Sequence, residues 1–435
     1  MPRPAGPGSA SFPCGTGEHT VTTEIHADIR PHADPITERS AWRRAVGVGL
    51  AAYVVSRLCV LAAAGVRAAQ VVVDAREDGE PESTAWTTIT GVLTSWDGRW
   101  YLELIRTGYP DSIPADITYE QLEARAAFFP VFPWLVRGVD VVLPGGDTLA
   151  ALFTNFVLGA IAVVLVGLLA RRLYSVDAAV RAMTLFAIFP GSFVLSFAYS
   201  EATLIVLAAA CLLLLLDERW LLAGLTAAVA TGARPNGIAL VAACAVASAV
   251  AIRRSRDWMS LVAVALAPLG FLGFQWYVDR TAGERGAWFR VQTEAWSEGT
   301  SFGLTAVSNT FDFVTQPLAS PTDALTALSM LALIAMVWAS WKVRLPLVPA
   351  AYSAVVVALM LIPETVTARP RFLFTAFPLL IGVAAWWTAL DARRDRTADH
   401  HRAGWERAGW DLTLVLCGAG LTAVTGLYAV FGAIP

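Results

Sequence analysis

The stretch TLAALFTNFVLGAIAVVLVGLL, residues 148–169, decides the fold class of this chain. It contains no charged residue, and the paired cations Arg171 and Arg172 follow it after a single alanine. A helix needs about 20 consecutive apolar residues to cross the hydrocarbon core of a bilayer. This stretch alone therefore predicts one membrane-spanning helix.

The composition extends that prediction to the whole chain. Of 435 residues, 56% are hydrophobic and 15% are charged, and the mean hydropathy is +0.57. We expect an all-α, polytopic membrane protein with about 11 transmembrane helices. The apolar runs cover residues 45–70, 148–169, 179–198, 200–216, 220–233, 236–252, 258–278, 323–341, 345–363, 371–390 and 411–433.

The cations predict the orientation of these helices, because cytoplasmic loops of membrane proteins carry an excess of Lys and Arg. RRSR at 253–256, WKVR at 341–344 and DARRDR at 391–396 all fall on one side, which we expect to be the cytoplasm. The alternation requires that residues 128–144, which contain prolines and charges, do not cross completely. We expect that segment to lie on the membrane surface or to enter it in part.

This orientation divides the chain into a tail and a membrane domain. Residues 1–44, rich in Pro, Gly, Ser and charge, are expected to form a mobile cytoplasmic tail, with the N-terminus in the cytoplasm. Residues 45–435 would form the transmembrane domain in the plasma membrane. Its long loops at 71–147 and 279–322 would face outward, and the first would carry helices at the membrane interface.

The placement of histidine restricts the chemistry of an outer site. The histidines all lie in segments predicted to be cytoplasmic: His19, His26, His32, His400 and His401. A general base on the outer side is then most simply an Asp or a Glu. No spacing typical of metal ligands occurs, so we expect neither metal nor cofactor, and the net charge of −3 gives no indication of nucleic-acid binding.

The segment TSWDGRWYLELIRTGYP, residues 94–110, contains the most unusual cluster of polar and aromatic residues in the first outer loop. After Asp97 it predicts an amphipathic helix on the membrane surface, its apolar side facing the lipid. Asp97 would stand at the start of this helix. It can cap the helix by accepting hydrogen bonds from free backbone N–H groups, or it can serve as a catalytic base, and the two roles can coexist.

Three arginines near predicted outer helix ends form a second cluster of candidates. Arg234 lies in TGARPNG, and Arg369 and Arg371 lie in TARPRF. The planar guanidinium group suits phosphate oxygens, although each arginine can instead reach toward the interface or pair with Glu201 or Glu364. Glu201 begins a long apolar run in FAYSEA and is either another carboxylate at a helix start or a group that positions its charged partners.

Four segments in a fixed order resemble the GPI mannosyltransferase II family, also called PIG-V, and its bacterial relatives. They are SWDGRWYLELIRTGY (95–109), ARAAFFPVFPWLVRG (124–138), FPGSFVLSFAYSEATLIVLAAACL (189–212) and LAGLTAAVATGARPNGIAL (222–240). That family carries Trp-Asp-Gly/Ala, Phe-Phe-Pro-x-x-Pro, Tyr-Ser-Glu and Arg-x-Asn-Gly elements in this order. The resemblance covers about residues 90–240. Pro235 is a minor departure, and the C-terminal half matches only in its helices and in a late Pro-Arg-Phe.

The resemblance implies a GT-C glycosyltransferase with its active site outside the cytoplasm. The donor would be a polyprenyl-phosphate sugar, with mannose as the expected sugar, and the acceptor a cell-envelope glycolipid or lipoglycan. Asp97 maps onto the essential aspartate and would be the general base. Arg234, Arg369 and Arg371 would bind the donor phosphate. The expected substrate contacts are Trp96, Trp100, Tyr101, Glu201 and Asn236.

Two other classes of function remain open at this point. A transporter or flippase for a polyprenyl lipid would keep ionisable residues near the middle of the membrane, whereas the unusual charges here cluster at predicted outer helix ends. A non-catalytic partner in envelope assembly would not require Asp97 and the arginines to converge.

Overall fold

The computed structural model describes residues 35–77, 79, 84–317, 319–365, 367–397 and 400–428. By internal contacts the chain divides into Met1–Ser40 and Ala41–Pro435. The second unit contains all the features described below. Of the tail expected at 1–44, residues 1–34 lie outside the described part, while residues 35–44 are helical and belong to a helix that begins at Pro35.

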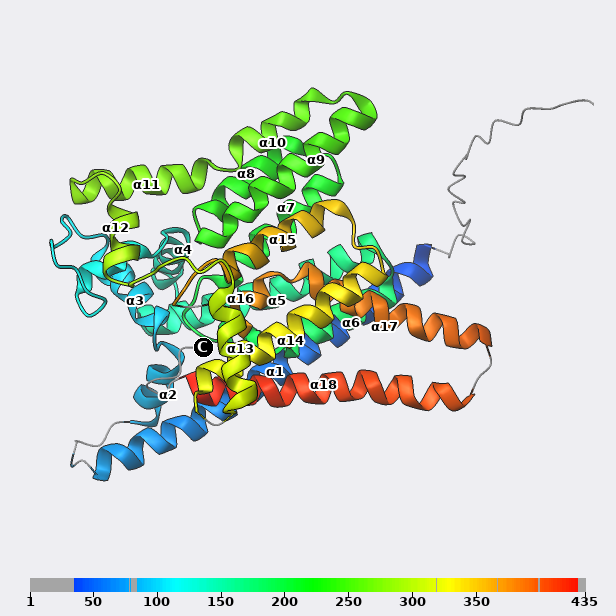
Figure 1. The fold of residues 1–435 in the computed structure, drawn as a ribbon, viewed down its shortest axis with the longest axis horizontal. Coiled ribbons are helices and arrows are strands. Elements are labelled where there is room, and N and C mark those ends of the chain that lie inside the picture. Colours follow the sequence, from blue (N-terminus) through cyan, green and yellow to red (C-terminus); the bar gives the residue numbers. More distant parts are fainter. Residues whose placement is uncertain are drawn as a thin grey trace, which may run out of the picture. The chain divides into compact units, whose positions relative to one another are not determined.

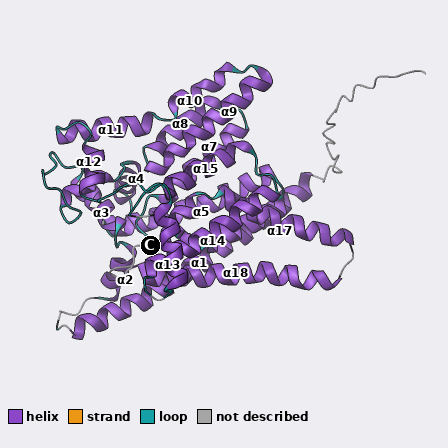
Figure 2. Cartoon of the chain, viewed as in Figure 1, coloured by secondary structure: helices purple, strands orange, loops and turns teal. Residues whose placement is uncertain are grey.

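Helices account for nearly all regular structure in the described residues (Figures 1 and 2). Outside them, an isolated β-bridge joins Thr300 and Pro363. The α-helices are α1 (Pro35–Glu77), α2 (Ala85–Leu93), α3 (Asp97–Thr107), α4 (Val131–Asp140), α5 (Asp147–Leu173), α6 (Val176–Ile188), α7 (Glu201–Leu216), α8 (Trp220–Thr231), α9 (Ala239–Ser255), α10 (Leu261–Leu266), α11 (Leu269–Ala282), α12 (Ala287–Glu294), α13 (Leu304–Thr315), α14 (Pro321–Lys342), α15 (Leu347–Leu361), α16 (Pro370–Thr375), α17 (Pro378–Thr397) and α18 (His400–Tyr428). The 3₁₀ helices are η1 (Leu122–Ala127), η2 (Pro190–Leu195), η3 (Pro235–Ile238) and η4 (Trp258–Ser260).

The chain is an all-helical, multi-pass membrane protein. Within the described residues, six helical segments are long and apolar enough to cross a bilayer: Glu38–Glu77, Asp147–Leu173, Pro235–Ser255, Trp258–Ala282, Pro321–Lys342 and Ala408–Leu427. Three shorter apolar helices, α7, α8 and α15, accompany them. The predicted class is confirmed, whereas the predicted count of eleven is not.

Prolines break three of the runs that were predicted to be single helices, and the run 258–278 is divided at Pro268 between α10 and α11. The run 179–198 ends as helix α6 at Ile188, and η2 starts at Pro190. The run 371–390 is divided between α16 and α17, and the second of these starts at Pro378. Proline lacks the N–H that would continue the helical hydrogen bonds and disfavours helix in the residue before it.

Helix α4 agrees with the expectation that residues 128–144 do not cross the membrane. It contains 10 residues, and at 1.5 Å per residue it extends only about 15 Å, half the thickness of the hydrocarbon core.

The two long loops pack against each other. In Figure 1 α3, α4 and α12 lie at the same end of the second unit. Buried aromatic residues from both loops and from α11, among them Trp100, Phe129 and Phe274, form one apolar cluster. Trp288 Nε1 donates to the carbonyl of Ala127 over 3.0 Å. These contacts cover α3 with protein.

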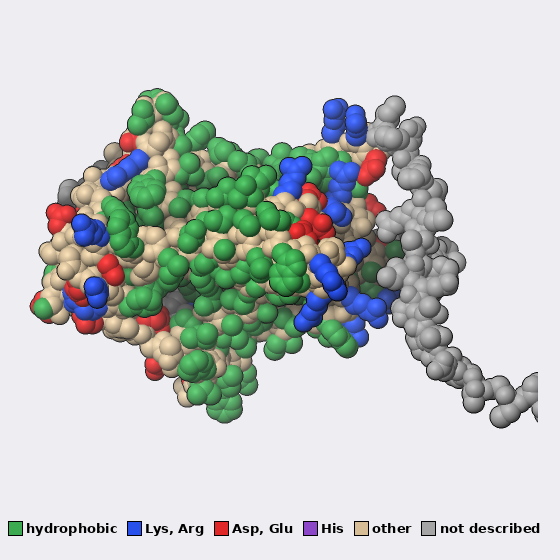
Figure 3. Space-filling model, turned by 90° about the horizontal axis from the view of Figure 1, so that it is seen from above, with side chains coloured by type: hydrophobic (Ala, Val, Ile, Leu, Met, Phe, Trp, Pro, Cys, Tyr) green, Lys and Arg blue, Asp and Glu red, His purple; other side chains and the backbone are tan. Residues whose placement is uncertain are grey.

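Three long helices end in cations. Helix α5 begins at Asp147, which pairs with Arg106 of α3, and ends at Arg171 and Arg172, about 40 Å away. Helix α9 carries Arg253 and Arg254 in its last turn, and α14 ends at Lys342. Figure 3 shows a broad hydrophobic band with charged side chains at both ends, among them a group of Lys and Arg side chains at one end.

Candidate active site

Helix α3 starts with Asp97 inside the helix and not at its cap. Trp96 occupies the N-cap position with φ +55° and ψ −119°, and its side chain makes no capping hydrogen bond. A positive φ is unusual for a residue other than glycine and marks a backbone that its surroundings hold in place. Asp97 is therefore the first helical residue, and its carboxylate is directed to partners other than the helix backbone.

The apolar side of α3 faces protein, which corrects the expectation that it faces lipid. Trp100 and Tyr101 are 4% and 2% exposed. The Trp100 ring stacks on Phe128, and Tyr101 meets Phe128 and Phe132 edge-on. Burial in this aromatic cluster also raises the pKa of Tyr101, so its hydroxyl stays protonated. Trp100 and Tyr101, which were expected as substrate contacts, are thus enclosed by protein side chains.

Both ends of α3 are fixed by side chains from elsewhere in the chain. At the start, the Tyr199 hydroxyl accepts a hydrogen bond from the Asp97 N–H over 3.2 Å and donates to the Ser95 carbonyl over 3.0 Å. At the end, Arg137 of α4 donates to the carbonyls of Leu104 and Ile105 over 2.9 and 2.8 Å. A cation at the free carbonyls of a helix C-terminus is favourable. The orientation of Asp97 is thus set from both ends of its helix.

The segment between α6 and α7, which contains Tyr199, is held by buried polar groups on the spanning helices. Asn155 of α5 is fully buried, and its Nδ2 donates to the carbonyls of Phe197 and Tyr199. Arg57 of α1 is also buried and donates to the Ser192 carbonyl over 2.6 Å and to the Ala187 carbonyl over 3.1 Å. These groups satisfy backbone carbonyls that the break between α6 and α7 leaves without helical partners.

Four charged side chains from distant parts of the chain meet at the start of α3. Arg371 Nη1 donates to Asp97 Oδ2 over 2.9 Å. Arg234 Nη2 lies 3.9 Å from the same oxygen and 3.0 Å from Glu201 Oε1. Arg234 Nη1 also donates to the Ser200 hydroxyl over 3.0 Å. The charges balance, with two guanidiniums and two carboxylates in one connected cluster.

Each member of this cluster stands at or beside the start of a helix. Asp97 and Glu201 are the first residues of α3 and α7, Arg371 is in the first turn of α16, and Arg234 directly precedes η3. The partial positive charge of helix starts favours the carboxylates and disfavours the arginines. The positive charges of the two arginines are therefore stabilised by the two carboxylates. The positive ends of the helices also suit this region to bind an additional anion.

The two carboxylates differ in their access to solvent. The Glu201 side chain is 0% exposed, whereas that of Asp97 is 16% exposed. Arg371 donates to Asp97 Oδ2, and Oδ1 accepts no hydrogen bond from a described residue. Glu201 is therefore a buried partner of Arg234, and Asp97 is the carboxylate that is open to solvent.

The remaining predicted residues lie around the cluster. Arg369 is 1% exposed and donates to the Thr326 hydroxyl of α14, so its contact differs from that of Arg371. Asn236 is half-buried in η3, two residues after Arg234, and Trp96 is half-buried next to Asp97. Within the described residues, no group of three or more His, Cys, Asp or Glu side chains is arranged to hold a metal ion.

Comparisons of the sequence with known proteins assign no family to this chain. No protein-family model matches the sequence, and no curated protein matches it. The GPI mannosyltransferase II resemblance therefore rests on the four sequence elements alone.

Solved structures with partial similarity include a protein bound to undecaprenyl phosphate and an oligosaccharyltransferase. ArnT from Cupriavidus metallidurans bound to undecaprenyl phosphate is 14% identical, with 80% of this chain and 75% of that chain covered and a TM-score of 0.43. The Archaeoglobus fulgidus oligosaccharyltransferase in complex with Zn and sulfate is 16% identical, with 69% and 44% covered and a TM-score of 0.40. The chain spans about half the length of that archaeal enzyme. At these TM-scores and identities the similarity carries no argument about the activity of this chain.

Sequence reasoning missed Tyr199, Ser200 and Asn155 as parts of the site. Tyr199 and Ser200 directly precede Glu201 in the AYSE segment, and the Ser200 hydroxyl lies 2.5 Å from that of Tyr101. Asn155 could have been recognised from the sequence, because an amide inside an otherwise apolar spanning run needs a buried hydrogen-bonding partner.

Proposed function

We propose that this chain is an inverting glycosyltransferase of the GT-C type, with Asp97 as general base. The observation that carries the proposal is the cluster at the start of α3, where a partly accessible carboxylate lies 2.9 and 3.9 Å from two guanidiniums contributed by distant helices. A carboxylate next to phosphate-binding cations is what transfer from a phosphate-linked sugar requires.

In the proposed reaction, an acceptor hydroxyl attacks the anomeric carbon of the donor sugar. The new C–O bond forms as the bond between that carbon and the phosphate oxygen breaks, and the hydroxyl proton passes to Asp97. The leaving lipid phosphate takes the bonding electron pair and gains a second negative charge. Arg371 and Arg234 would stabilise this developing charge. Because phosphate is a good leaving group, no step requires a metal ion.

The resting ion pair suggests how the base becomes available. The donor phosphate would compete with Asp97 for Arg371, since both are anions that a guanidinium can bind through two hydrogen bonds. Transfer of Arg371 to the phosphate would release Asp97 Oδ2 for the acceptor hydroxyl. Arg234 would remain oriented by Glu201, which lies 3.0 Å away and is out of reach of solvent.

We also propose the side of the membrane on which the cluster lies. Arg234 directly precedes η3 and α9, and Arg369 contacts Thr326 near the start of α14, while the last turns of α9 and α14 carry Arg254 and Lys342. Because cations favour the cytoplasmic side, we place the cluster on the extracytoplasmic face of the plasma membrane and the N-terminus in the cytoplasm. The PIG-V resemblance makes polyprenyl-phosphate-mannose the proposed donor and a cell-envelope glycolipid or lipoglycan the proposed acceptor.

The direct test supplies donors to membranes that contain the overproduced chain. Polyprenyl-phosphate-mannose labelled in the sugar should transfer label to an envelope glycolipid, whereas a nucleotide-linked mannose should not in the absence of an enzyme that makes the lipid donor. Passage of the labelled lipid across the membrane without a glycosylated product would favour a transporter. Binding without either outcome would favour a non-catalytic assembly partner.

A further inference from the structure

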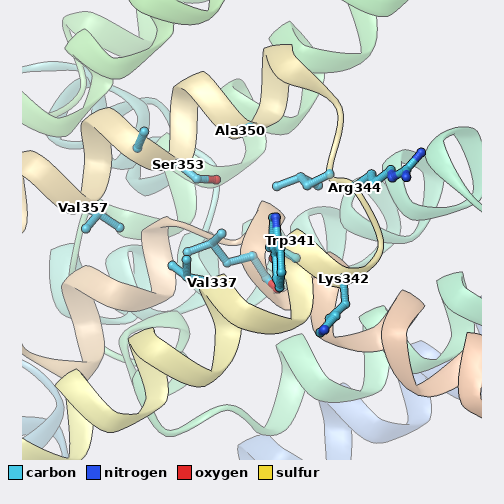
Figure 4. Close-up of a pocket in the computed structure, with 11 residues that line it drawn as sticks. Val337, Trp341, Lys342, Arg344, Ala350, Ser353 and Val357 are labelled. Atoms are coloured by element: carbon cyan, nitrogen blue, oxygen red, sulfur yellow. The ribbon is translucent and has the colours of Figure 1, made fainter.

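A second site lies between α14, α15 and α17. It is a cavity of about 850 Å³ whose walls are mainly apolar and whose polar lining groups are two serines and two cations. Figure 4 shows Val337 and Val357 toward one end, Trp341 in the middle, and Lys342 and Arg344 toward the other end with their head groups directed outward. The cavity is therefore apolar along its length and cationic at one end.

The cations at that end are available to an anion. The cavity lining contains no carboxylate, and neither Lys342 nor Arg344 forms an ion pair in the part of the chain that the structure describes. Lys342 Nζ lies 4.7 Å from the centre of the Trp341 ring, a cation–π contact that leaves its N–H groups free to donate. Arg344 is exposed in the turn between α14 and α15.

The cavity is remote from Asp97. Thr326, which accepts a hydrogen bond from Arg369, lies near the start of α14. The helix continues without a break to Lys342, and at 1.5 Å per residue this segment extends about 24 Å. The cationic end of the cavity therefore lies at the membrane face opposite to the polar cluster. The last turns of α5, α9 and α14 also carry their Lys and Arg residues at that opposite face.

We infer that this cavity binds an anionic glycerophospholipid of the inner leaflet. Its acyl chain would lie along Val337, Ala354 and Val357, and its phosphate would meet Lys342 and Arg344. Basic pockets between spanning helices on the cytoplasmic side bind anionic lipid head groups. A lipid is the occupant that matches both properties of the cavity, because Val337 and Trp341 also stand among the exposed apolar residues of the spanning helices.

The bound lipid would fill space between α14 and α15, which are joined by the short turn at 343–346. Helix α14 contributes Thr326 to the Arg369 contact, and α15 leads into the segment that precedes Arg369 and Arg371. The lipid would thus stabilise the helix pair that supports the arginines from the far side of the membrane. This inference stands whether or not the chain transfers sugar.

The test measures lipid binding by the full purified chain. Native mass spectrometry would count phosphatidylglycerol and phosphatidylcholine retained from mixed micelles, and thermal unfolding would be followed with each lipid added. We expect the wild type to retain phosphatidylglycerol in preference and to unfold at a higher temperature with it. The Lys342→Gln/Arg344→Gln variant should lose about 25-fold in that preference, about fivefold for each cation removed.

Two further variants test the apolar part of the cavity and the position of its cations. Ala354→Trp fills the apolar part without changing charge and should reduce retention of both lipids. Arg253→Gln/Arg254→Gln removes as many cations from α9 and should leave the preference unchanged. The inference is overturned if the wild type shows no preference, if the Lys342/Arg344 variant keeps it, if the α9 variant loses it equally, or if Ala354→Trp retains as much lipid as the wild type.

Discussion

Arg371 Nη1 lies 2.9 Å from Asp97 Oδ2, although 274 residues separate them in the chain. The contact joins the start of α3, in the long loop between α1 and α5, to the start of α16, in the C-terminal half. Arg234 and Glu201 extend it into a cluster of four charges.

Arg371→Lys keeps the positive charge but removes the planar pair of donors. We expect the KM for the lipid-linked donor to rise about tenfold or more, because a hydrogen bond to a charged group contributes about 1.5–3 kcal/mol. Steady-state kinetics with the donor varied would measure the change. Arg99→Lys, which alters an exposed arginine of α3, should leave KM as in the wild type. An unchanged KM in Arg371→Lys would mean that this guanidinium does not bind the donor.

Glu201→Gln removes the buried negative charge that faces Arg234. The nearest remaining carboxylate, Asp97, lies 3.9 Å from that guanidinium and is shared with Arg371. Breaking a buried ion pair leaves an uncompensated charge, so we expect a loss of about 3–5 kcal/mol in the free energy of unfolding. Thermal unfolding in detergent should show a clearly lowered Tm, while Glu103→Gln on the surface of α3 should not. Equal Tm values for Glu201→Gln and the wild type would remove Glu201 from the ion-pair network.

Gly191→Ala tests the packing that places Arg371. A Cβ at Gly191 would lie 2.1 Å from the Pro370 carbonyl oxygen and 2.7 Å from the Phe374 Cβ, so α16 would have to move. We expect transfer activity to fall strongly. Gly98→Ala is the matched control, since its Cβ would meet Ala198 and Tyr199 at ordinary distances of 3.5 Å. The packing argument fails if both variants are equally active.

The sequence predicted the class of the fold well because membrane helices are encoded locally. A run such as residues 148–169 needs no tertiary information to be recognised, and α5 covers it completely. The number of helices was harder, because Pro190 and Pro378 interrupt runs whose hydrophobicity is continuous. A hydropathy profile does not show where a helix ends inside a continuous apolar run.

The members of the cluster could be chosen from sequence, but their contacts could not. Asp97, Arg234 and Arg371 were candidates because charges are rare in such a chain, and the structure brings them together. Arg369 was an equal candidate in the sequence, and only the register of α16 directs it to Thr326 instead. The burial of Trp100 depends on Phe128 and Trp296 from elsewhere in the chain, which no local pattern reveals.

The most direct measurement compares sugar transfer by Asp97→Asn and by Glu103→Gln, two isosteric changes of a carboxylate on the same helix. Transfer of labelled mannose from the polyprenyl-phosphate donor would be measured for each, with thermal unfolding to verify that both variants fold. We expect Asp97→Asn to lose about 10²- to 10⁴-fold in rate, the usual contribution of a general base, and Glu103→Gln to keep wild-type activity. Full transfer by a folded Asp97→Asn variant would contradict the proposed mechanism.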